Sequence, residues 1–162
     1  MSARSRVLVA AAAFLLGAAV PAAAQDENER DYLIDLYEVN VFVDDLAPDA
    51  EAAGLTRDGI EEAVQDRLRE EGVPLGRSQL AGDLYVRVGT HRGTTGLYAY
   101  FARVSLQQLV TIEGNQERAF VDTWDIDSLG TVGEGNLPQV EQVVLQLVDL
   151  FIDDYFAVNG GR

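Results

Sequence analysis

Cysteine and lysine are absent from the 162-residue sequence, and histidine, tryptophan and methionine occur once each. The lack of cysteine excludes disulfides, thiolate nucleophiles, sulfur-ligated metals and the lipidated cysteine of a bacterial lipoprotein. One histidine without any cysteine also argues against zinc, which usually takes several nitrogen or sulfur ligands. The sequence contains no Walker-type phosphate loop, no G-x-S-x-G and no H-E-x-x-H. We therefore expect no metal and no cofactor.

Positive charge is scarce after the N-terminal region. All 27 acidic residues follow residue 25, and the ten arginines in that part of the chain leave it a net charge of −17. A surface this acidic repels nucleic acid and anionic lipid, so we expect neither as a partner. Two origins of the acidity stay open, adaptation to high salt or ordinary acidity in a sequence that favours arginine.

The N-terminus has the layout of a secretory signal peptide. Two arginines precede the uncharged segment Val7–Val20, and Ala22–Ala24 supplies the small residues of a cleavage site. As a helix that uncharged segment would span about 21 Å, short of the ~30 Å hydrocarbon core. The sequence predicts that residues 1–24 are removed and that 25–162 form a single exported domain. We expect it in the periplasm or outside the cell, without a stable membrane anchor after cleavage.

Apolar periodicity predicts the secondary structure of the exported part. Residues 55–71 and 138–155 have the 3.6-residue period of helices that are apolar on one side. Four segments have the alternation or composition of strands, namely 37–43, 84–89, 97–112 and 119–127. The order β-α-β-β-β-α predicts an α+β fold, in which a mostly antiparallel four-stranded sheet has two helices on one face.

Finer features of these segments are also expected from the sequence. Capping-box spacing predicts helix starts at Asp58 and at Asn136. A straight strand over the third strand segment would exceed about 50 Å, so we expect a bulge near Gln107. Residues 26–31 and 44–54 are expected to be irregular.

Four stretches carry a resemblance to a known family: G-L-T-R-D-G-I-E-E-A-V-Q-D-R-L-R-E-E-G-V, L-Y-A-Y-F-A-R-V-S-L-Q-Q-L-V, D-T-W and L-V-D-L-F-I-D-D-Y-F-A-V-N. They resemble exported bacterial proteins of unassigned function. More loosely, the element order is similar to that of small α/β envelope accessory domains. Neither resemblance includes a catalytic motif, so together they imply an envelope accessory protein and no particular site residue.

Residues 119–136 have the sequence A-F-V-D-T-W-D-I-D-S-L-G-T-V-G-E-G-N, which could be a calcium- or phosphate-binding loop. Asp125 and Asp127 could open a calcium loop, but Leu129 occupies the third ligand position. A phosphate loop would need a lysine. The alternation of Trp124 and Ile126 with aspartates favours a strand that continues into a glycine-rich lead to the last helix.

Candidate catalytic groups are few. His91 lies in T-H-R-G-T-T-G with only threonines nearby, which favours a solvated turn residue over a general base. Close carboxylate pairs could serve acid–base or glycoside chemistry, although chance pairs are expected among so many acids. These pairs are Asp44–Asp45, Glu61–Glu62 and Asp153–Asp154. A carboxylate-dependent hydrolase or carbohydrate-active protein therefore remains the alternative function.

A second candidate site follows from the expected fold. If both helices cover one face of the sheet, the other face presents side chains of the opposite parity. These are Tyr85, Arg87, Phe101, Arg103, Thr123 and Asp125. Arginine and aromatic residues are favoured at interfaces, although the same residues could form a solvated face with cross-strand ion pairs. We predict a binding site at Tyr85, Arg87, Phe101, Arg103 and Asp125, for another protein or a second copy.

Export can be tested directly. N-terminal sequencing of the protein recovered from outside the cytoplasm should begin at Gln25 or within a residue or two of it, because signal peptidase cuts after small residues. Recovery of Met1 on membrane-bound protein would contradict cleavage.

Overall fold

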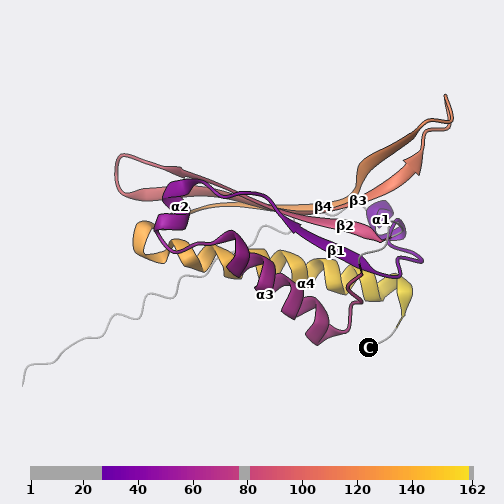
Figure 1. Cartoon of the computed structure of the whole chain (residues 1–162), viewed down its shortest axis with the longest axis horizontal. Helices are drawn as coiled ribbons and strands as arrows, with labels where there is room; N and C mark the ends of the chain where they lie inside the picture. The colour runs from indigo at the N-terminus through magenta and orange to yellow at the C-terminus, as the bar shows by residue number, and fades with distance from the viewer. Residues whose placement is uncertain (1–26, 77–80, 161–162) are drawn as a thin grey trace, which may run out of the picture.

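The computed structural model describes residues 27–76 and 81–160, so the predicted signal peptide lies outside the described residues. A four-stranded sheet forms one layer and two long helices form the other (Figure 1). The elements are α1 (Glu27–Asp31), β1 (Val39–Val43), α2 (Pro48–Ala52), α3 (Arg57–Glu71), β2 (Gly82–Arg92), β3 (Leu97–Thr111), β4 (Arg118–Gly133), the 3-10 turn η1 (Glu134–Gln139) and α4 (Val140–Asn159). The predicted α+β fold is confirmed.

The strands lie in the order β1-β2-β3-β4. β1 runs parallel to β2 after the α3 crossover, and the other two pairings are antiparallel. The alternation predicted for β2 is confirmed, since Leu84, Val86 and Val88 are buried. Val86 lies opposite Val104, which in turn lies opposite Ile126, so one buried row crosses three strands.

Both long helices lie on the same side of the sheet (Figure 1). α3 contacts β1, α4 contacts β3 and β4, and the two helices contact each other. The apolar stripe of α4 is buried, including Val144, Val148 and Phe151. The ring of Phe151 meets Trp124 of β4 edge-on at 5.2 Å between centroids. Burial of this stripe against the sheet is the main source of the core.

A buried carboxylate joins three elements at one end of the core. Asp154 of α4 is only 5% exposed. It accepts hydrogen bonds from Arg30 Nε at 2.7 Å and from Trp124 Nε1 at 3.0 Å. Both oxygens are thereby satisfied, as a buried charge requires. The expectation of an irregular segment at 26–31 is wrong, because α1 forms there and is held to α4 by this contact.

The predicted helix starts are wrong in detail. Thr56 caps α3, since its backbone is extended and its Oγ1 accepts the Gly59 N–H at 3.2 Å, while Asp58 is already helical. α4 has no side-chain cap and continues from η1, which contains Asn136. The segment 44–54, expected to be irregular, contains the short helix α2.

β4 differs from the prediction in two places, at Thr123 and beyond residue 127. The bulge expected near Gln107 is confirmed there, but the extra residue is Thr123 on β4. Beyond residue 127 the strand continues to Gly133, so the expected glycine-rich lead to the last helix is wrong. Glycine fits at 130 because the Tyr100 ring lies across it, and a Cβ there would come within 2.5 Å of the Tyr100 hydroxyl.

Beyond the bulge, β3 and β4 leave the rest of the sheet. The pairing of β2 with β3 ends at Asp83 and Gln107, and from there β3 pairs only with β4. Figure 1 shows the resulting two-stranded ribbon bending away from the body on the side opposite to the helices. We call residues 107–122 the arm.

The core can be probed with matched phenylalanines. Phe151→Ala should lower the free energy of unfolding by about 3–5 kcal/mol, because the ring is 0% exposed and its removal leaves a cavity. Phe120→Ala in the arm, where the ring is 62% exposed, should cost the monomer no more than about 0.5 kcal/mol. Urea unfolding measures both. Similar losses for the two variants would mean that α4 is not packed as described.

Candidate functional site

The face of the sheet opposite α3 and α4 has no described helix over it (Figure 1). All five residues predicted from the sequence lie on this face. Arg87 is exposed and the other four are half-buried by their neighbours: Tyr85, Phe101, Arg103 and Asp125. We call this surface the open face.

Two apolar patches lie on either side of a charged row. Arg87 and Arg103 lie directly opposite each other in the centre. On one side of this row, Phe42 of β1 stacks on Tyr85 with centroids 5.1 Å apart. On the other side, Phe101 lies opposite Leu129, which is 74% exposed. The open face thus alternates apolar, cationic and apolar along the strands.

Carboxylates neutralise the two arginines. Arg87 Nε donates to Asp44 Oδ2 at 2.7 Å, and this hydrogen bond raises the pKa of Arg87. Arg103 Nη2 lies 3.0 Å from Asp122 and 3.1 Å from Asp125. These contacts offset the repulsion expected between like charges placed opposite each other. They also restrict the positions of both guanidinium groups on the open face.

Members of the open face that were missing from the predicted site include Phe42, Asp44, Asp122, Asp127 and Leu129. Asp122 was missed because the bulge at Thr123 shifts the parity of β4. Leu129 was missed because the strand was expected to end at residue 127. Phe42 has the correct parity in the sequence, and Asp44 follows the same parity just beyond β1, so a wider reading of the alternation would have found both. Thr123 instead donates to Gln108 Oε1 at 2.6 Å and belongs to the bulge.

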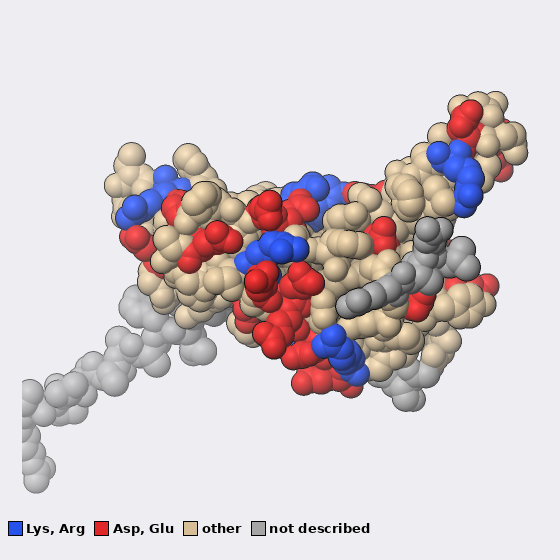
Figure 2. Space-filling view, viewed as in Figure 1, with Lys and Arg blue, Asp and Glu red and all other residues tan. Residues whose placement is uncertain are grey.

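Raised segments border the open face at both ends. In the outline of Figure 2, the arm at one end and the β2–β3 turn at the other rise above the upper side of the molecule between them. The surface between these two segments is broad and open. Such a shape suits a protein surface better than a small molecule, which binding sites usually enclose.

A second depression, of about 720 Å³, follows the outer edge of β1 beside α3. Its lining includes the apolar residues Val39, Val41 and Leu75 together with polar side chains of α3. The edge of β1 is partly closed, because the Val39 N–H donates to Pro74 O and its C=O accepts from the Gly76 N–H. At the other end, Arg57 occupies the edge.

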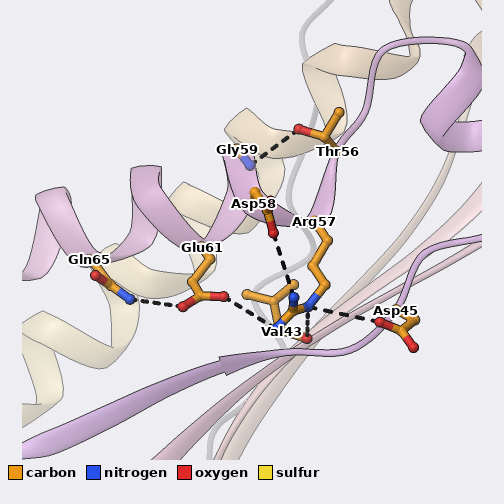
Figure 3. A network of polar contacts seen from close by, with 8 residues as sticks. All are labelled: Val43, Asp45, Thr56, Arg57, Asp58, Gly59, Glu61 and Gln65. Atoms are coloured by element: carbon orange, nitrogen blue, oxygen red, sulfur yellow. Dashed lines mark hydrogen bonds and ion pairs between the residues drawn. The ribbon is translucent and has the colours of Figure 1, made fainter.

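Arg57 forms the polar network at that end of β1 (Figure 3). Its Nε donates to Val43 O at 2.9 Å, and its Nη2 contacts Glu61 at 3.4 Å. Asp45 and Asp58 lie 3.9 and 3.5 Å from the same guanidinium. Arg57 thus ties the first turn of α3 to the end of β1, which is a structural role.

The carboxylate pairs considered for catalysis have structural contacts. Asp154 is buried beneath Arg30, Asp44 pairs with Arg87, and Glu61 accepts from Gln65 at 3.1 Å. A shallow depression of about 360 Å³ has acids along it, but all of its residues lie on α3. Glycoside chemistry instead needs two carboxyl groups that face each other across a substrate.

His91 lies near the end of β2, so its expected place in a turn is wrong, although it is exposed as expected. It faces the open side opposite Ala99. Within residues 27–76 and 81–160, no three histidine, aspartate or glutamate side chains are grouped so that they could hold a metal ion. No helix in those same ranges is both long and apolar enough to cross a bilayer.

The chain matches no protein-family model and no curated protein. Among solved structures it is similar to a minor lipoprotein from Acinetobacter baumannii, with 10% sequence identity and a TM-score of 0.30. The similarity covers 73% of this chain and 95% of the lipoprotein chain. A TM-score this low carries no argument about function.

The titration of Tyr85 tests its place on the open face. Burial raises the pKa of Tyr85, and the carboxylates of Asp83 and Asp44 raise it further. Its neutral form therefore stabilises the fold below the pKa of the unfolded tyrosine, and this contribution is lost as pH rises through the higher folded pKa. Tyr85→Phe should thus reduce the loss of thermal stability between about pH 9 and about pH 11.

Tyr98 and Tyr155, whose pKa values are also raised by burial, stay in both proteins and provide the internal reference. An identical alkaline loss in the wild type and in Tyr85→Phe would contradict the burial of Tyr85 beneath Phe42.

Proposed function

We propose that this chain is an exported, non-enzymatic envelope protein that binds another protein on its open face. The observation that carries the proposal is the open face itself, in which the Phe42–Tyr85 stack and the Phe101–Leu129 patch border two arginines. Export is supported by the signal-peptide pattern of residues 1–24.

The chemistry of the face favours protein recognition. Aromatic side chains bury large areas at little entropic cost, and arginine is enriched where interfaces are tightest. Arg87 and Arg103 are already oriented by carboxylates, so binding would order few additional rotamers. Preorganised apolar patches around a polar centre are the usual anatomy of a specific interface.

The negative charge of the open face restricts the kind of protein that can bind there. Asp44, Asp122, Asp125 and Asp127 outnumber the two arginines on the open face, and the chain from Gln25 onward carries −17. An acidic partner would be repelled over distances of a Debye length, whereas a basic surface would be steered toward the face. The partner is therefore a protein with a basic or neutral surface that carries exposed apolar side chains.

The alternative, a carboxylate-dependent hydrolase, has weaker support. In the part of the chain that the structure describes, the acidic depression lies along a single helix. Three of the open-face carboxylates, Asp44, Asp122 and Asp125, are paired with arginines. Neither arrangement provides the acid and base on opposite sides of a bond that hydrolysis of a glycoside requires.

Site-specific photo-crosslinking in the protein's own cells tests the proposal. A photoreactive phenylalanine analogue at Phe42 or at Leu129 should yield a discrete protein adduct, because these side chains are exposed at opposite ends of the face. The same analogue at Glu70, exposed on α3, is the matched control. Adducts from Glu70 alone, or none from either face position, would overturn the proposal.

A further inference from the structure

The arm is apolar for a segment that projects from the body. Its larger side chains are exposed, with Leu109 at 38%, Phe120 at 62% and Val121 at 36%. An isolated two-stranded hairpin is at best marginally stable in water, and three or more strands with an apolar face are usually needed. The arm therefore has the composition of a segment that another strand completes.

The missing strand would add to β4. Within the described ranges, β4 pairs only with β3, so its outer edge along Arg118–Asp122 presents unpaired backbone groups. Such an edge is a template for a strand of another chain. On the body, the bulge at Thr123 and the carboxylates of Asp125 and Asp127 disfavour the pairing of another strand along the same edge. The arm has only one carboxylate on this stretch, at its base.

The sequence of this edge, R-A-F-V-D, is complementary to itself. In an antiparallel pairing centred on Phe120, Arg118 of one copy lies opposite Asp122 of the other, and the reverse contact forms at the other end. Opposite charges placed in this way stabilise a strand pair, and aromatic side chains in direct opposition add to it. A two-fold interface requires this kind of self-complementarity, because the same residues contribute from both copies.

The charges needed for this pairing are available. Arg118 is the one arginine in the described ranges for which no ion pair is formed, whereas the other seven contact an acid. Asp122 uses its Oδ2 to accept from Arg103, which leaves the other oxygen for a second donor. Arg103 also keeps Asp125 as a partner.

We propose that two copies of this chain associate by antiparallel pairing of the β4 edges of their arms, centred on Phe120. The two arms then form a four-stranded sheet. Because Leu109 lies opposite Phe120 within each arm, one face of that sheet carries a continuous row, Leu109–Phe120–Phe120–Leu109. This association goes beyond the proposed function and does not depend on it, since it uses the arm edge and shares only Asp122 with the open face.

Analytical ultracentrifugation from about 1 μM to about 1 mM at ~0.15 M salt should show a monomer–dimer equilibrium, as expected for a small interface. Arg118→Asp should weaken dimerisation about tenfold or more, because both ion pairs become like-charge contacts. Arg69→Asp on α3 makes the same change in net charge away from the arm and should dimerise like the wild type. A monomeric wild type, or equal dimerisation of the two variants, overturns the proposal.

Charge exchange between two variants gives a sharper result. Asp122→Arg alone should also lose the dimer, because it opposes two arginines. A mixture of Arg118→Asp with Asp122→Arg should recover association as a mixed dimer, since each acid then faces an arginine. Thermal unfolding checks that each variant is folded. Two folded variants that fail to associate when mixed would contradict the pairing.

Cysteine substitution tests the register, because the chain has no cysteine of its own. Ala119 of one copy should lie opposite Val121 of the other. On mild oxidation, a mixture of Ala119→Cys and Val121→Cys should therefore give the mixed disulfide as its main product, ahead of either symmetric dimer. A statistical mixture of the three disulfides would rule out the proposed register.

Discussion

The contact between Trp124 of β4 and Phe151 of α4 lies within a core that occupies only one side of the sheet, between the sheet and the two long helices. Trp124 also donates to Asp154, so the same residue fixes the end of α4 and, through Arg30, the position of α1. Successive side chains of a strand point to opposite faces of the sheet. This packing therefore places every second side chain against the helices and leaves the others on the open face. Both proposed surfaces depend on it, since α4 leaves the open face uncovered and does not reach over the arm.

Much of this arrangement could be predicted from the sequence, because period and parity are local properties. Alternation correctly placed Leu84, Val86 and Val88 inside and Tyr85 and Arg87 on the opposite face. The binding role of that face stays a prediction. What the sequence could not reveal depends on tertiary contacts. A single extra residue at Thr123 reverses the parity beyond it, and nothing local marks that position.

Two other failures have the same origin. Short helices are unstable by themselves, so α1 owes its existence to the buried Asp154 contact, which joins residues far apart in sequence. Gly130 indicated a loop because glycine is depleted in strands. The Tyr100 ring across it allows the strand to continue. In both cases a weak local preference was overridden by a contact that only the fold creates.

The outer edges of β1 and β4 differ in how far they are protected from pairing with a strand of another chain. At β1, residues 74–76 and the Arg57 side chain occupy most of the outer edge. Along the body of β4, a bulge and two aspartates discourage a neighbouring strand. An arginine that lacks an ion pair is unusual in so acidic a chain, and Arg118, the one such arginine in the described ranges, stands on a stretch of the β4 edge without such protection. Two copies with charges near −17 repel each other at long range, so any association must place its few contacts far from both bodies. The stretch Arg118–Asp122, which lies on the projecting arm and carries opposite charges at its two ends, meets that requirement, whereas an interface through the acidic body would not.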